Sequence, residues 1–190
     1  MLQPNDYPLS VQFDLAAGTF APITSKSERR LSEMMQSFYD VDAARAIVEQ
    51  GDRVLYEVLY SPFETSKSDM AMCVTRIFPG KVGDEYHMTK GHLHERDDQP
   101  EIYFCLQGEG YLLLQTLDGE FRAEHWTKGT LSHIPPMWMH RTVNMGADTL
   151  VFVSVYNLSA GHDYEVVEAK GFKMLVVERE GQAVLVESEK

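Results

Sequence analysis

The chain has 190 residues, of which 44% are hydrophobic and 24% are charged, and its formal net charge is −12. This composition is typical of a folded domain and excludes collagen, a coiled coil or a disordered chain. The negative charge argues against a nucleic-acid partner, because phosphates require clustered Lys and Arg. We expect one compact domain over residues 1–190.

The sequence shows no feature of a membrane or secreted protein. Its longest apolar runs, such as 150–156, are too short to cross a bilayer as a helix. The first residues have neither a basic nor an apolar signal-peptide region, so we expect no membrane partner and a cytoplasmic location. Cys73 and Cys105 are the only cysteines. We therefore expect two buried apolar thiols and no disulfide framework.

Residues 1–52 are expected to form an N-terminal arm and a helical segment. VQFDL at 11–15 lies among scattered Pro and Gly, which indicates a short strand. Within 29–52 the apolar residues recur at helical spacing, which predicts one broken helix or two short ones. Asp40 or Asp42 is the expected helix cap between them.

Residues 53–190 have the periodicity of β-strands, and we expect them to form a β-barrel with C-terminal strands. Turn signals separate most of the apolar runs, and no run alternates with a helix in the βαβ manner. Short strands at nearly regular spacing predict a mainly β fold, an antiparallel barrel or jelly roll. The expected strands are 54–60, 70–80, 101–110, 111–116, 120–126, 130–135, 140–145, 149–156, 172–178 and 183–187.

Possible metal ligands gather at His92, His94 and Glu101. Residues two apart on a strand face the same side, so we expect both imidazoles to point together. The polar loop 95–100 is expected to turn an antiparallel hairpin that returns Glu101 beside them. His140 follows a double proline and begins another strand-like run, which a barrel can bring over the same cavity.

Strand alternation, and the usual role of a lone histidine, separate expected site residues from structural ones in this region. Alternation from Glu101 places Tyr103 on the same face of its strand, close to the expected metal. A lone histidine is more often a hydrogen-bonded structural residue than a ligand. We therefore expect structural roles for His87, His125 and His133.

These spacings resemble the two motifs of the cupin superfamily, whose fold is a jelly-roll antiparallel β-barrel. Four ligands and three backbone markers fall in the expected order, with 20 residues between the two motifs. Two features depart from the motifs: the usual glycine five residues before His92 is absent, and Met137 stands where the second motif usually has Gly. The matching residues are His92, His94, Glu101 and Gly108, followed by Gly129, Pro135, His140 and Asn144.

A closer resemblance is to the cupin-type phosphoglucose isomerases. It lies in the stretches 75–83, 85–94, 135–144 and 156–172, and it extends back to RRLS in the helical segment. It implies a homodimeric, metal-dependent enzyme that interconverts glucose 6-phosphate and fructose 6-phosphate in glycolysis and gluconeogenesis.

The resemblance also implies specific site residues. The ligands of one divalent metal per subunit would be His92, His94, Glu101 and His140. Fe²⁺ is the expected ion, and Mn²⁺, Ni²⁺, Co²⁺ and Zn²⁺ suit the same donors. Glu101 and Tyr156 are the expected catalytic residues. The expected contacts to the phosphate and sugar are Thr75, Thr89, Gly91, Tyr103, Tyr156, His162 and Tyr164.

Several alternatives stay open at the level of the sequence. The reaction could pass through a cis-enediolate, with Glu101 or a tyrosine as acid and base, or through hydride transfer between C1 and C2. A cupin with the same donors could instead be an Fe or Mn dioxygenase, or a non-enzymatic sugar-binding protein. Use of mannose 6-phosphate is also undecided.

Overall fold

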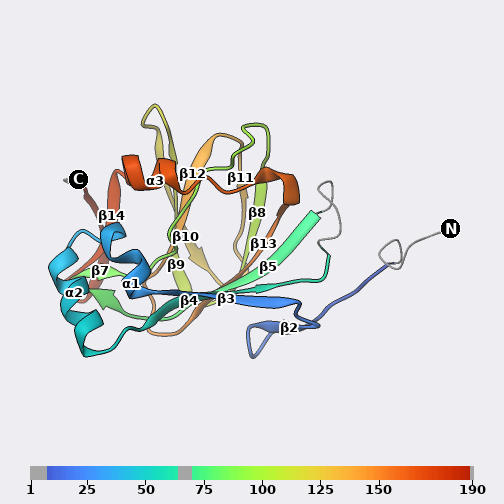
Figure 1. Cartoon of the computed structure of the whole chain (residues 1–190), viewed down its shortest axis with the longest axis horizontal. Coiled ribbons are helices and arrows are strands. Elements are labelled where there is room, and N and C mark those ends of the chain that lie inside the picture. The colour runs from blue at the N-terminus through green and yellow to red at the C-terminus, as the bar shows by residue number, and fades with distance from the viewer. Residues whose placement is uncertain (1–7, 64–69, 189–190) are drawn as a thin grey trace.

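Residues 8–63 and 70–188 are described by the computed structural model of the chain, and they form a mainly β structure (Figure 1). The strands of these residues pair antiparallel in each of the four sheets. The mainly β, antiparallel fold class predicted from the strand spacing is therefore confirmed.

The largest sheet has six strands in the order β11-β8-β13-β5-β4-β3. These strands are β3 (Ser25–Arg30), β4 (Val54–Tyr60), β5 (Met70–Ile77), β8 (Glu101–Gln107), β11 (Leu131–Ile134) and β13 (Leu150–Asn157). The edge strand β3 lies in the segment expected to be an arm. Its sequence SKSERR has no apolar alternation, so only its pairing with β4 makes it a strand.

A three-stranded sheet faces the six-stranded sheet across the main core, as in a jelly roll. Its strands are β9 (Glu109–Thr116), β10 (Phe121–Thr127) and β12 (Trp138–Asn144). Trp126 of β10 is fully buried, and its ring centroid lies 5.8 Å from that of Tyr103 and 5.3 Å from that of Phe152. These aromatic contacts join the inner faces of the two sheets.

The outer face of the six-stranded sheet carries a smaller apolar cluster under the N-terminal hairpin. This hairpin consists of β1 (Gln12–Asp14) and β2 (Thr19–Ala21). Phe20 packs with Leu59 and Val151 of the sheet, and Gln107 Nε2 donates to Ala16 O at 2.9 Å. The hairpin thus covers apolar side chains that the sheet would otherwise expose.

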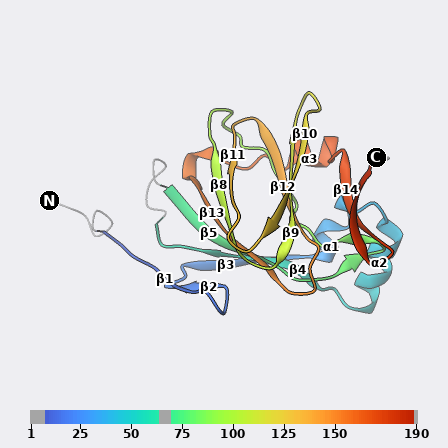
Figure 2. The same ribbon diagram turned by 180° about the vertical axis from the view of Figure 1, so that it is seen from behind.

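The helical segment contains two short α-helices, α1 (Leu31–Met34) and α2 (Val41–Gln50), separated by the 3₁₀ turn η2 (Met35–Ser37). This confirms the expected interruption. Asp40 caps α2, because its side chain accepts a hydrogen bond from Ala43 N at 2.8 Å. The two helices lie at the end of the molecule opposite the N-terminal hairpin (Figures 1 and 2).

The remaining elements lie in the linker before β8 and at the C-terminal end of the chain. A four-stranded sheet contains β6 (Lys81–Val82), β7 (Glu85–Tyr86), β14 (Met174–Arg179) and β15 (Gln182–Glu187). The chain between β13 and β14 forms the 3₁₀ turn η3 (Leu158–Ala160) and the helix α3 (Glu165–Lys170). Among the described residues, no helix has the length and apolar character needed to cross a membrane.

The turn before β12 explains the departure at Met137. Its φ is 70°, in the left-handed region that favours glycine, and its side chain is 48% exposed. Because the side chain points to solvent, it clashes with no core residue, and the only cost of having Met here is the unfavourable backbone conformation. The turn of the second motif is therefore kept without its glycine.

Candidate metal centre

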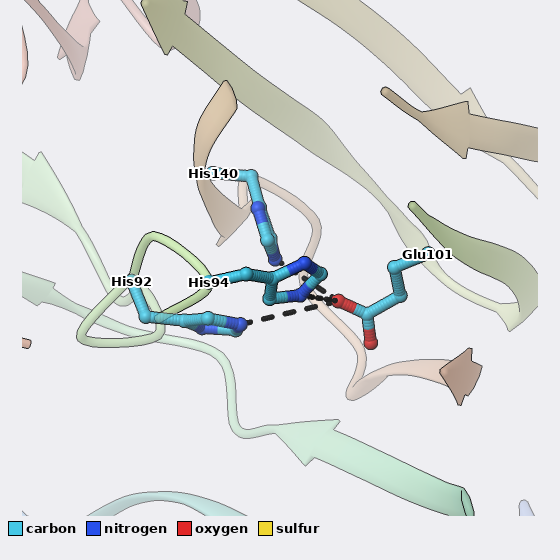
Figure 3. A group of neighbouring side chains, drawn as sticks. All are labelled: His92, His94, Glu101 and His140. Carbon is cyan, nitrogen blue, oxygen red and sulfur yellow. Dashed lines mark hydrogen bonds and ion pairs between the residues drawn. The ribbon is translucent and has the colours of Figure 1, made fainter. Parts of the chain in front are cut away.

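The four predicted ligands converge on one point inside the molecule. The ligand atoms of His92, His94, Glu101 and His140 all lie within 4.8 Å of one another. Figure 3 shows the three imidazoles pointing toward the Glu101 carboxylate. The distances from Glu101 Oε2 to the Nε2 atoms are 3.1 Å for His140, 3.3 Å for His94 and 3.9 Å for His92.

The ligands come from both facing sheets and from the linker before β8. Glu101 is the first residue of β8, and His140 lies in β12. The backbone N–H of His92 donates to His140 O at 3.1 Å, and the N–H of His140 donates to His92 O at 3.0 Å. This single antiparallel bridge fixes the first histidine beside the last.

The expected hairpin between the first two histidines and Glu101 is wrong. Both edges of β8 are occupied, by β11 on one side and β13 on the other. The His92–His94 segment therefore has no free edge to pair with on that strand. It forms isolated bridges elsewhere, including Leu93 with Asp163.

Backbone carbonyls orient two of the imidazoles. Nδ1 of His94 lies 2.8 Å from Gln99 O, and Nδ1 of His140 lies 3.0 Å from Trp138 O. A carbonyl only accepts, so Nδ1 donates in both rings and the neutral rings present a lone pair at Nε2. Such outer contacts are typical of metal-ligating histidines.

The donor set fits a divalent cation. Nε2 of His92 is buried with no hydrogen-bond partner among the described residues. Neutral His94 and His140 likewise direct lone pairs at the carboxylate of Glu101, so acceptor faces acceptor. A bound cation would satisfy all four groups at once, and three imidazoles with one carboxylate suit Fe, Mn, Co, Ni or Zn.

The electrostatics of the cluster favour the metal-binding forms of His92 and Glu101. Burial lowers the pKa of His92 well below its usual value, and the neighbouring histidines add to this. Burial opposes ionisation of Glu101, but its contacts with the imidazoles of His140 and His94 outweigh burial and lower the pKa of the carboxyl group. A neutral imidazole and an ionised carboxylate are the ligating species. Burial lowers the pKa of His94, but its contacts with the Glu101 carboxylate and Gln99 O outweigh burial and raise the pKa, so a cation would compete with a proton for this ring.

A cavity of about 150 Å³ opens beside the cluster, and His92 and Glu101 form part of its wall. The expected contact residues Thr75, Thr89, Gly91, Tyr103, Tyr156, His162 and Tyr164 all line this same cavity. They come from β5, β8, β13, the linker before β8 and the loop after β13. The structure thus brings together every residue that the sequence assigned to the site.

The aromatic residues of the wall form a stack that leads to the predicted metal ligands. The ring of His162 lies 4.4 Å from that of His92, edge-on, and stacks on Tyr164 at 5.9 Å. Burial raises the pKa of Tyr164 and raises that of Tyr103 well above its usual value. Both phenols therefore stay protonated and can donate hydrogen bonds at neutral pH.

Backbone geometry shapes the wall around Thr89 and Gly91. Thr89 Oγ1 accepts a hydrogen bond from Thr142 N at 3.0 Å, which leaves its hydroxyl proton free to donate. Gly91 has a φ of 77°, and a Cβ atom there would lie 3.0 Å from His140 O. Glycine allows this close approach between the linker and β12.

Sequence reasoning missed the part of the wall that comes from β3 and β4. These residues are Ser27, Arg29, Tyr56, Val58 and Tyr60, and the wall is completed by Cys73, Phe152 and Ser154. Tyr56, Val58 and Tyr60 alternate in the sequence, so they could have been assigned to one face. Nothing in the sequence indicates that this face meets the four predicted ligands.

Three further histidines lie outside the cluster. Nδ1 of the buried His87 donates to Phe78 O at 3.0 Å, and His125 lies 2.8 Å from Glu109 at the surface. His133 is exposed on β11. None of the three is among the four grouped ligands.

Comparison with known proteins decides the family. The sequence pattern of the family described as glucose-6-phosphate isomerase matches residues 28–190. The chain belongs to this family. It is 42% identical over 183 residues to the glucose-6-phosphate isomerase of Thermococcus litoralis, with 96% of each chain covered. This membership confirms the isomerase family to which the sequence motifs pointed.

Other relatives with the same name are somewhat less similar. The glucose-6-phosphate isomerase of Sinorhizobium medicae is 37% identical, over 90% of this chain and 81% of its own. That of Pyrococcus horikoshii is 40% identical over 95% of both chains. Among solved structures, oxalate decarboxylase of Bacillus subtilis matches with a TM-score of 0.45 and 22% identity, over 54% of this chain and 26% of that one.

Proposed function

We propose that the protein is a metal-dependent glucose-6-phosphate isomerase that interconverts glucose 6-phosphate and fructose 6-phosphate. The observation that carries the proposal is the convergent set of three imidazoles and one carboxylate beside a cavity lined by hydroxyl groups. Membership of the isomerase family favours this activity over a dioxygenase or a sugar-binding protein without catalysis.

His92, His94, Glu101 and His140 would hold one divalent metal per subunit, with Fe²⁺ as our first choice and Mn²⁺, Ni²⁺, Co²⁺ or Zn²⁺ as alternatives. Such an ion, when bound, supplies Lewis-acid polarisation of the sugar carbonyl and stabilises the oxyanion that develops there. The protein side chains around it bind and orient the open-chain sugar.

Glu101 and Tyr156 are the proposed acid and base. They are direct partners in the pairing of β8 with β13, so their side chains are neighbours on the inner face of the sheet. The lowered pKa of Glu101 makes its carboxylate a weak base while His94 and His140 hold it. This assigns more of the proton handling at C1 and C2 to the Tyr156 hydroxyl, or else favours the hydride route.

The remaining wall residues would bind the hydroxyl groups and the phosphate. Thr75, Thr89, Tyr103 and Tyr164 offer hydroxyl donors, and His162 is neutral because burial lowers its pKa. A closed set of such donors holds an extended sugar phosphate in one orientation. Gly91 lets the backbone approach the ligand closely.

The test is an isomerase assay with controlled metal content. Protein stripped with EDTA is reloaded with Fe²⁺ or Mn²⁺, and glucose 6-phosphate formed from fructose 6-phosphate is followed with glucose-6-phosphate dehydrogenase. We expect a rate that is lost on stripping and restored on loading. A rate at background under all metal conditions would refute the proposal.

We also propose a single cupin domain over residues 1–190, a homodimer and a cytoplasmic location. The family resemblance suggests the dimer, and multi-angle light scattering of the purified protein tests it. A monomer mass across the working concentration range would contradict it.

A further inference from the structure

The wall of the cavity beside the four predicted ligands includes a cationic side chain with no role assigned so far, that of Arg29. Among the described residues that line it, Arg29 is the only Arg or Lys, and Glu101 is the only carboxylate. The carboxylate belongs to the metal ligands. A phosphate monoester carries about 1.5 to 2 negative charges at neutral pH, so the position of Arg29 matters for any phosphorylated ligand.

Arg29 is held at the end of the cavity formed by the sheet edge. It lies in β3 directly opposite Tyr56 of β4, and both side chains line the cavity, so they are cross-strand neighbours on the same face. Thr89 and Gly91, two of the expected phosphate contacts, line the same cavity as Arg29 and Tyr56. Arg29 therefore belongs to the same group of donors as the hydroxyl and backbone groups expected to bind phosphate.

The charge of Arg29 is only weakly compensated by the protein. Its carboxylate partner is Glu33, at 3.4 Å, and both side chains are partly in water, with 41% and 47% exposed. Such exposed ion pairs are weak and exchange their partners readily. Lys90 is the other cation near this end, but its ammonium group is paired with Glu168 at 2.6 Å.

We propose that Arg29 binds the phosphate group of the substrate and so makes the site selective for phosphorylated sugars; this rests on the proposed isomerase function. The planar guanidinium can engage two phosphate oxygens at once, which a lysine cannot do. Tyr56 orients the guanidinium from the neighbouring strand. The reactive end of the sugar is then directed toward the four grouped ligands.

Kinetics of adjacent arginine variants test the proposal. Arg29→Ala should raise the KM for fructose 6-phosphate roughly 10- to 100-fold, the effect expected for one charged hydrogen-bonded pair. Its kcat should stay close to the wild-type value, because phosphate binding is equal in the ground and transition states. Arg29→Lys should recover part of the loss, since it keeps the charge and loses the fork.

Arg30→Ala is the matched control. Arg30 is the next residue in the chain, but its Nη1 donates to Asp52 O at 3.0 Å and its side chain does not line the cavity. Its KM and kcat should equal those of the wild type. Melting temperatures of the variants show whether any change in KM reflects lost folding.

Binding without turnover gives an independent readout. Calorimetric titration of EDTA-stripped protein should show weaker binding of fructose 6-phosphate by Arg29→Ala, while binding of unphosphorylated fructose stays the same. Equal fructose 6-phosphate affinity in Arg29→Ala and Arg30→Ala would overturn the proposal. A wild type without isomerase activity would instead refute the proposed function, so the two failures are distinguishable.

Discussion

Replacing His140 by alanine removes one of the four grouped ligand atoms and should weaken metal binding severely. Structural Zn²⁺ sites with four ligands bind with apparent free energies of about 10–16 kcal/mol, and on that scale one ligand accounts for roughly 2.5–4 kcal/mol. At about 1.4 kcal/mol per tenfold change, the dissociation constant should rise roughly 100- to 1,000-fold. The loss should be near the upper figure, because the His140 side chain is only 1% exposed and Trp138 O holds its ring in position.

The measurement is a calorimetric titration of Mn²⁺ into EDTA-stripped protein, with the metal content after dialysis determined by mass spectrometry. His133→Ala is the matched control, since His133 is exposed on β11 and outside the cluster. It should bind as the wild type does. Melting of the stripped proteins reports folding separately. If His140→Ala and His133→Ala bind Mn²⁺ with equal affinity, the four residues do not form a metal site.

Three further variants test the fold and the chemistry. Gly110→Ala would place a Cβ atom 2.2 Å from Val143 O, so it should cost about 1–3 kcal/mol and lower Tm by roughly 2–4 °C per kcal/mol. Gly146→Ala is the control, because a Cβ atom at this position would lie 3.5 Å from its nearest neighbour. If the two variants had the same Tm by calorimetry, the reasoning would be contradicted. Burial lowers the pKa of His87 from 6.5 to about 4. Between pH 6.5 and about 4 the imidazole is therefore protonated in the unfolded chain but not in the folded one, and the free energy of unfolding falls by about 3 kcal/mol as the pH drops through this range. Urea unfolding at both ends of the window should show less acid loss in His87→Gln, and an unchanged loss would refute this. Tyr156→Phe should lower kcat roughly 100-fold or more with little change in KM if its hydroxyl moves a proton, whereas an unchanged kcat would exclude that role.

Period-two and helical patterns predicted most of the elements, because they depend on which side chains meet the core. Glu101 and Tyr103 were assigned to one face of a strand, and both are buried on that face. The break in the helical segment was equally readable, since Asp40 supplies the cap that starts the second helix. Both cysteines are buried, as expected in apolar strands.

Sequence periodicity failed to predict segments whose conformation depends on pairing with a strand distant in the sequence. The His92–His94 segment looked like a strand of a local hairpin, but its bridge is to His140, far along the chain. The polar strand β3 carries no periodic signal, and its pairing with β4 alone places Arg29 in the cavity wall. Local sequence cannot report which free edge a segment will find.

The sequence by itself determined the residue types of the site, the mainly β class and the order of the four ligands along the chain. The tertiary structure decided that these ligands come from two facing sheets and a linker, and that an arginine from the edge strand joins the same cavity. The physical reason is that side-chain chemistry and burial preference are local properties, whereas strand partners are chosen by competition among all the edges of the fold.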